Sequence, residues 1–145
     1  MLGFADKRVK AVEETELYMR SMFAGLVAPD ERLPVQVFAD PYVAGFLQVL
    51  ATHSVATAYL FRTPDTTTIN EVLEQCLDRM VPGGGATVRL TLAAASVSAH
   101  PLHANYLAGR HDGSEHVRTL LASDDIARNE QHEAFRSVVK RHFPS

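Results

Sequence analysis

The chain has a single cysteine, no tryptophan and little net charge. One cysteine, Cys76, cannot form a disulfide within the chain, which favours a reducing compartment. The formal net charge of −3 provides no overall attraction to polyanions, so we expect no nucleic-acid partner. The sequence does not open with the positive charge and long apolar run of a secretory signal, and we expect a cytoplasmic protein.

Formal charge is missing altogether from residues 41–61, a length that could span a bilayer. Five polar residues within this segment argue against a lipid-facing helix: Gln48, Thr52, His53, Ser54 and Thr57. We therefore expect no membrane partner, and instead a helix buried at the centre of the protein. The pair Asp40–Pro41 predicts its start, because aspartate caps the first free amides and proline fits the first turn.

The composition and the apolar periodicity predict one all-helical domain over residues 1–145. Hydrophobic residues make up 46% of the chain and charged residues 21%, which is the balance of a globular protein. Apolar residues recur at intervals of three, four or seven along most of the chain, which is the helical period. We expect a bundle of about five to seven helices around the uncharged central helix.

Caps and helix breakers set the boundaries of the other helices. The first helix is expected over residues 4–28, because a proline follows. Thr68 and Glu71 form a capping-box pattern at the start of the third helix, and the triple glycine 83–85 ends it. Ser123 is the expected start of the last helix.

Residues 86–100 are compatible with two structures. Apolar and polar residues alternate over residues 87–92 as in a strand, whereas the alanine-rich continuation favours a helix. We choose the helix. The alternative is an α+β fold in which residues 87–92 pair with residues 33–38. The triple glycine before this segment is interpreted as a hinge, because the Walker lysine and the GxGxxG pattern of phosphate-binding loops are missing.

Four of the seven histidines lie close together in the sequence: His100, His103, His111 and His116. Imidazole nitrogens bind divalent transition metals, so these residues are the candidate metal site and such a metal the candidate cofactor. No HExxH or cysteine-rich spacing accompanies them, and a solvated surface is the alternative. Within this region, Gly109 is expected to end a short helix over residues 101–108, so that another begins near residue 112.

The central helix carries a second candidate site. Helical geometry places small and polar residues along one side of it and most large apolar residues on the other. Such a stripe could line a pocket whose ligand needs a few hydrogen bonds. The alternative is a core histidine bonded to a backbone carbonyl. The candidate ligand-binding residues are Gln48, Thr52, His53 and Thr57.

These features favour a non-catalytic helical module that binds another protein or a small ligand, with a regulatory role. The apolar content and the amphipathic first helix also favour a homodimer. No catalytic residue is assigned, because Cys76 lies among apolar neighbours and resembles a small core residue. The competing hypothesis is a metal-dependent or acid–base enzyme that uses the histidines over residues 100–116, or His53.

Overall fold

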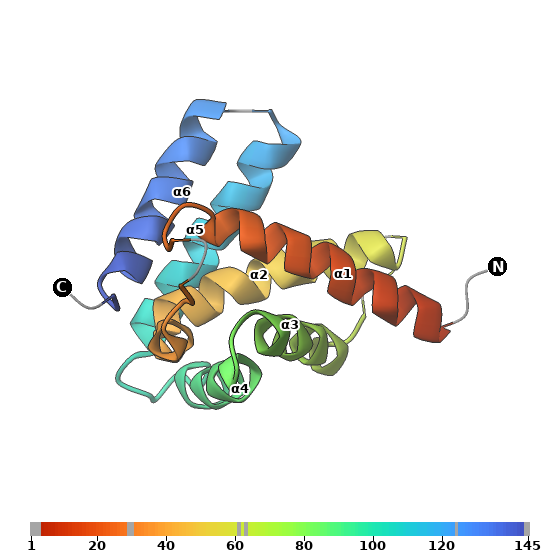
Figure 1. Ribbon diagram of the computed structural model, residues 1–145, viewed down its shortest axis with the longest axis horizontal. Helices are drawn as coiled ribbons and strands as arrows, with labels where there is room; N and C mark the ends of the chain where they lie inside the picture. The colour runs from red at the N-terminus through yellow and green to blue at the C-terminus, as the bar shows by residue number, and fades with distance from the viewer. Residues whose placement is uncertain (1–3, 29–30, 61, 63, 124, 144–145) are drawn as a thin grey trace.

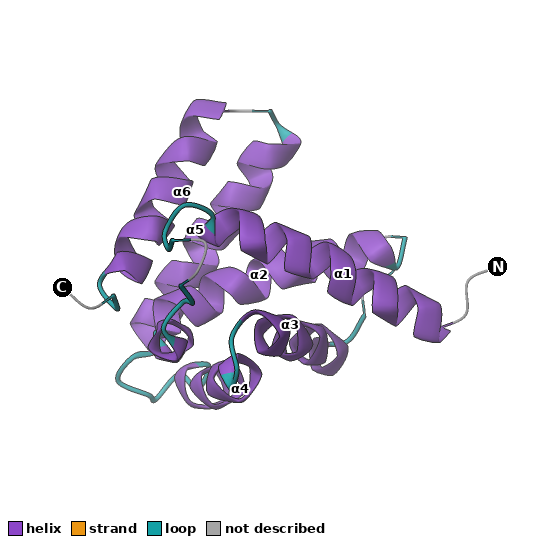
Figure 2. Ribbon diagram, viewed as in Figure 1, coloured by secondary structure: helices purple, strands orange, loops and turns teal. Residues whose placement is uncertain are grey.

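A computed structural model describes residues 4–28, 31–60, 62, 64–123 and 125–143. These residues form six α-helices and one short 3-10 helix (Figure 1). In chain order they are α1 (Phe4–Phe23), η1 (Val35–Ala39), α2 (Pro41–Ala58), α3 (Thr66–Met80), α4 (Gly84–Ala95), α5 (His103–Leu121) and α6 (Asp125–Lys140). No strand occurs in the described ranges (Figure 2). The predicted all-helical class is confirmed, and the α+β alternative is wrong.

Helix α2 forms the centre of the bundle. α1 crosses one side of it, α3 and α4 lie together on another, and α5 and α6 stand side by side at one end (Figure 1). Every other helix contacts α2, and so does η1. An ionised side chain here would lose its hydration without compensation, which explains why α2 carries no formal charge. The buried residues of α2 are Val43, Ala44, Gly45, Phe46, Leu47, Gln48, Leu50, Ala51, Ser54, Val55 and Ala58.

Glycines allow the backbones of α2 and α5 to touch. Gly109 and Gly113 lie four residues apart and therefore share one face of α5. A Cβ on Gly109 would overlap the carbonyl oxygen of Tyr42, and one on Gly113 would lie 3.0 Å from that of Phe46. Gly45 on α2 approaches the α5 backbone equally closely. The expected helix end at Gly109 is therefore wrong, because α5 runs through both glycines and uses them for packing.

The triple glycine packs α4 against α3. Gly83 precedes α4 with a φ of 83°, a conformation that glycine adopts without strain. A Cβ on Gly85 would lie 2.5 Å from the carbonyl oxygen of Glu74. The Gly85 amide donates a hydrogen bond to Asp78 Oδ1 at 2.8 Å, so a carboxylate of α3 already occupies this donor. These contacts argue against both a flexible hinge and a phosphate site.

Residues 33–38 and 87–92 lie together in space, although not as strands. η1 packs on α4, and the Thr91 hydroxyl lies 2.9 Å from the carbonyl oxygen of Phe38 and 2.8 Å from that of Thr87. The helix predicted after the triple glycine is confirmed as α4. It ends at Ala95, earlier than the expected residue 100.

The start of α2 agrees with the prediction, whereas the end of α1 and the starts of α3 and α6 differ from it. The Asp40 side chain accepts a hydrogen bond from the Tyr42 amide at 2.9 Å, as the cap expectation requires. α1 ends at Phe23, because Gly25 adopts a φ of 80°. α3 is capped by Asp65, so the capping box at residue 68 is wrong. α6 begins at Asp125, two residues after the expected start.

The Asp65 carboxylate accepts a hydrogen bond from the Thr68 amide at 2.8 Å. That hydrogen bond is the main reason why the pKa of Asp65 is lowered. Asp124, which follows the expected start of the last helix at Ser123, lies outside the described residues. Among the helices described, none combines the length and the apolar character that crossing a bilayer requires.

Replacing Gly109 with alanine tests the close contact. An exposed helix glycine gains about 1 kcal/mol of stability from this change. At Gly109 we expect a loss of about 2–3 kcal/mol, because the new methyl group would overlap the Tyr42 carbonyl and push the helices apart. Urea denaturation followed by circular dichroism measures the free energy of unfolding. The control is Ala108→Gly on the exposed side, which should cost about 1 kcal/mol. A stabilised Gly109→Ala protein would contradict the contact.

Candidate functional site

A buried hydrogen-bond network joins α2 to α3 and α5. Gln48 on α2 is only 6% exposed. Its Nε2 donates to Asn70 Oδ1 on α3 at 3.1 Å. Its Oε1 accepts two hydrogen bonds from α5, from the Tyr106 hydroxyl at 2.7 Å and from Arg110 Nη1 at 2.6 Å. We call these four residues the Gln48 network. It supplies the partners that a buried amide requires.

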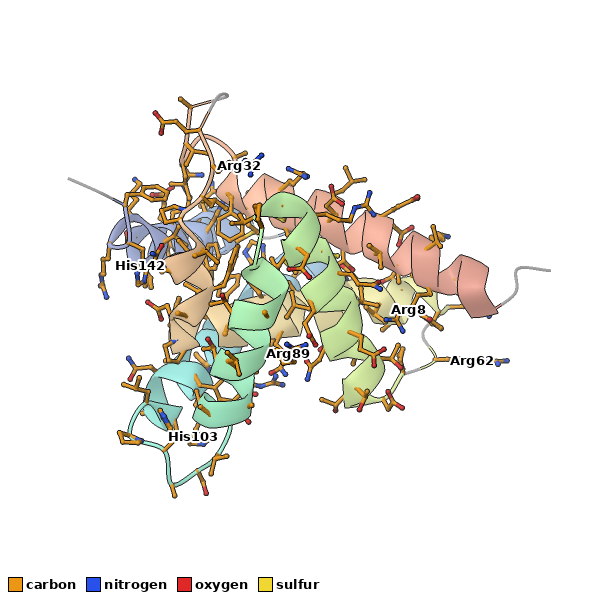
Figure 3. All side chains as sticks on the ribbon, turned by 60° about the horizontal axis from the view of Figure 1, so that its bottom comes forward. Arg8, Arg32, Arg62, Arg89, His103 and His142 are labelled. Carbon is orange, nitrogen blue, oxygen red and sulfur yellow. The ribbon has the colours of Figure 1, made fainter. Side chains whose placement is uncertain are left out.

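A hollow of about 290 Å³ opens beside the network between α2, α3, α4 and α5. We call it the Gln48 hollow. Gln48, Asn70 and Tyr106 line it together with Glu74 and Arg89, whose side chains form an ion pair at 3.2 Å. Figure 3 shows Arg89 on α4 beside α3. Groups from four helices thus converge on one concave surface, as is typical of small-ligand sites.

A second hollow of about 370 Å³ lies between α2 and α5. We call it the His53 groove. Its lining residues recur at helical spacing on both walls, which shows that one face of each helix forms the groove. Arg110 lines the groove and also donates to Gln48, so the two hollows are joined by one side chain. The lining residues are Val49, Thr52, His53 and Ala56 on α2, and Arg110, Ser114 and Val117 on α5.

Three of the four residues predicted on α2 line these hollows. Gln48 lines the Gln48 hollow, and Thr52 and His53 line the groove. Thr57 is exposed and lines neither. The hydroxyls of Thr52 and Thr57 donate to the carbonyl oxygens of Gln48 and His53, each four residues earlier, which is common for threonine within a helix.

The sequence analysis missed Tyr106 and Arg110. Both lie on the helix that was expected to break at Gly109. A continuous α5 places Tyr106 and Arg110 four residues apart on one face, opposite α2. The only available signal was the spacing of Gly109 and Gly113, which indicates close helix packing as readily as a helix end.

The four candidate metal-binding histidines have separate surroundings. His100 accepts a hydrogen bond from the Leu102 amide at 3.1 Å, and His103 donates to the Ala95 carbonyl at 2.8 Å. Figure 3 shows His103 at the start of α5, where the loop from α4 ends.

Farther along α5, His111 is exposed, whereas His116 is buried against the rings of Phe46 and Tyr18. Within the part of the chain that the structure describes, no three His, Cys, Asp or Glu side chains are arranged to hold a metal ion. The expected convergence of these histidines on a metal is therefore not found.

Cys76 is a core residue, as predicted. Its side chain is fully buried, and Sγ donates to the carbonyl oxygen of Val12 at 3.2 Å, which ties α3 to α1. Burial, and secondarily the charge of Glu16, raises the pKa of the thiol to about 12. A nucleophilic cysteine needs a thiolate near neutral pH, so this environment does not support catalysis by Cys76.

A cluster of polar side chains holds the start of α2. The Tyr42 hydroxyl donates to Asp112 Oδ2 on α5 at 2.5 Å, and His142 after α6 lies 2.8 Å from Asp40 Oδ2. Figure 3 shows His142 at this end of the bundle. Burial raises the pKa of Tyr42, and the hydrogen bond to Asp112 raises it further. The phenol therefore stays protonated and acts as a structural tie between α2 and α5.

Comparison with known protein families, curated proteins and solved structures finds no match for this chain. The chemistry of the site must therefore follow from the groups that face the two hollows. These groups include an amide, a phenol, an imidazole and two guanidinium groups. They favour binding through hydrogen bonds and charge.

A double-mutant cycle tests whether the Gln48 network acts as one unit. Tyr106→Phe should cost about 1 kcal/mol of stability, because it removes one donor to Gln48. The same change in a Gln48→Leu protein should cost nothing, because the hydroxyl then has no acceptor there. The free energies of unfolding of the four proteins, measured in urea, give the coupling. Additive effects would show that the network is not coupled.

Proposed function

We propose that this chain is a non-catalytic module that binds a small molecule along the polar face of α2. The observation that carries the proposal is the environment of Gln48, a buried amide held by side chains from two other helices at the edge of a hollow. Its hydrogen bonds fix the side chain before any ligand arrives. A fixed site loses less conformational entropy on binding, which favours affinity.

The shape of the site supports a small ligand. The hollows of about 290 and 370 Å³ lie near the lower end of the range for pockets that bind small molecules. Each combines apolar lining with a few polar groups, which is the usual composition of such pockets. A purely structural network would need Gln48 and its partners, but it would not need the adjoining hollows.

We also propose a cytoplasmic location, because the single cysteine forms no disulfide within the chain, which suits a reducing compartment.

Thermal unfolding with a panel of small molecules tests this function. The panel contains amino acids, amides, nucleosides, sugars and carboxylic acids at millimolar concentration. At least one compound should raise the melting temperature by a few degrees, because a ligand that binds only the folded state stabilises it. The effect should disappear in Asn70→Ala or His53→Ala.

Thr57→Ala is the matched control, because Thr57 lies on the same helix and lines neither hollow. Its response to the panel should equal that of the unchanged protein. A panel without any stabilising compound would count against the function. So would a stabilising compound whose effect survives both the Asn70 and the His53 substitutions.

We also propose that the chain forms a homodimer through the tip of the α5–α6 pair. Leu121 and Ile126 flank the turn there and are 72% and 77% exposed. Apolar side chains of this size are stabilised when a second copy covers them. Sedimentation equilibrium should give twice the chain mass of 15.9 kDa, and Leu121→Glu should reduce it to the mass of one chain.

Leu90→Glu is the control for the dimer, because Leu90 on α4 is exposed to nearly the same extent, 69%. This variant should keep the dimer mass. A monomer in the unchanged protein, or equal dissociation in both variants, would exclude the proposed surface.

A further inference from the structure

Arg110 differs from the other half-buried arginines in lacking a charged partner. The described part of the chain contains three arginines of intermediate exposure, Arg8, Arg110 and Arg136. Arg8 lies 2.9 Å from Glu71, and Arg136 lies 3.9 Å from Glu133. Within the described ranges, no Asp or Glu oxygen lies within 4.0 Å of Arg110. Its positive charge is therefore not neutralised by the protein.

The contacts of Arg110 hold its position but leave most of its donors available. Nη1 donates to the neutral amide of Gln48, and the guanidinium lies 5.9 Å from the centre of the Tyr106 ring. A guanidinium carries five N–H donors in a planar fork that matches a carboxylate. Partial burial removes water from this cation, so an anion bound there would compensate for lost hydration.

Both walls of the groove supply further polar groups. His53 on α2 and Ser114 on α5 line the groove with Arg110, and their side chains form no hydrogen bond with any described residue. The Thr52 hydroxyl proton is already used by the Gln48 carbonyl, so Thr52 contributes contact area and not a donor. The groove therefore places one cation and two free polar groups around the same space.

The rest of the groove is apolar. Val49 and Ala56 on α2 face Val117 on α5 across it. A ligand that suits this lining has one negative head group and a short hydrocarbon chain. A second charge on the ligand would have no partner among the described lining residues, of which Arg110 alone is permanently charged.

We propose that the His53 groove binds a small monocarboxylic acid, with the carboxylate on Arg110 and the chain along Val49, Ala56 and Val117. This inference rests on the proposed function and specifies its ligand class and its location. Arg110 then has two roles, because it binds the ligand and also completes the Gln48 network.

The first test compares three probes on the unchanged protein at pH 7. Hexanoate has the proposed head and chain, hexanamide lacks the charge, and acetate lacks the chain. NMR titration of the ¹⁵N-labelled protein should show hexanoate binding at least about tenfold more tightly than either control. The amide signals of Thr52, His53 and Ser114 should shift. Equal affinity for hexanoate and hexanamide would overturn the proposal.

The second test removes the charge. Arg110→Gln removes the positive charge and keeps a polar side chain, and it should weaken hexanoate binding about tenfold or more. The matched control is Arg118→Gln on the same helix, an exposed arginine that lines neither hollow, and this change should alter the affinity by less than about twofold. An undiminished affinity in Arg110→Gln would overturn the proposal. If that variant does not fold, the comparison of hexanoate with hexanamide on the unchanged protein decides.

The outcomes also separate this inference from the proposed function. Hexanoate shifts confined to Asn70, Ser96 and other residues of the Gln48 hollow would overturn the carboxylate site in the groove while supporting a ligand site on α2. Stabilisation by an uncharged compound of the panel, without any response to hexanoate, would also overturn the carboxylate site while supporting a ligand site on α2. A panel without any stabilising compound would remove the proposed function itself.

Discussion

The contact between the backbones of α2 and α5 is the constraint on which the rest of the structure depends. Gly45, Gly109 and Gly113 remove the side chains that would otherwise separate the two helices. At this short distance, groups on α5 can reach the amide of Gln48 at 2.6 and 2.7 Å. A wider separation would leave the buried Oε1 of Gln48 without a donor, and that would cost about 1–3 kcal/mol. The glycines thus determine both the packing of the bundle and the geometry of the candidate site.

The uncharged character of α2 follows from the same arrangement. A helix that contacts all its neighbours is buried over most of its surface, where an ionised group would lose its water, and apolar side chains therefore dominate it. The polar residues that remain must find partners inside the protein. Gln48 does so through α3 and α5, which fixes the orientation of both helices around α2. Apolar packing tolerates small rotations of a helix, whereas hydrogen bonds from two sides do not.

Sequence patterns predicted correctly some of the features that depend only on residues within or next to one helix. The cap at Asp40 and the uncharged centre both follow from residues within or next to α2. They failed where two distant segments share a contact. Glycine has a low helix propensity, so the sequence alone predicts a helix end at Gly109. The close contact with Tyr42 on α2 shows that packing outweighs the cost of a glycine within α5. Tyr106 and Arg110 lie 58 and 62 residues from Gln48, so no local pattern could join them.

The same reasoning explains why histidines that are clustered in the sequence have separate surroundings in the structure. A helix turns by about 100° per residue, so nearby histidines are spread around its axis and metal ligands must meet at special intervals. His111 consequently faces water, whereas His116 packs against Phe46. The polar stripe of α2 recurs at intervals of three and four, which keeps Val49, Thr52, His53 and Ala56 on one wall of the groove. The residue types indicated which chemistry was available, and the helical period decided which of these residues could act together.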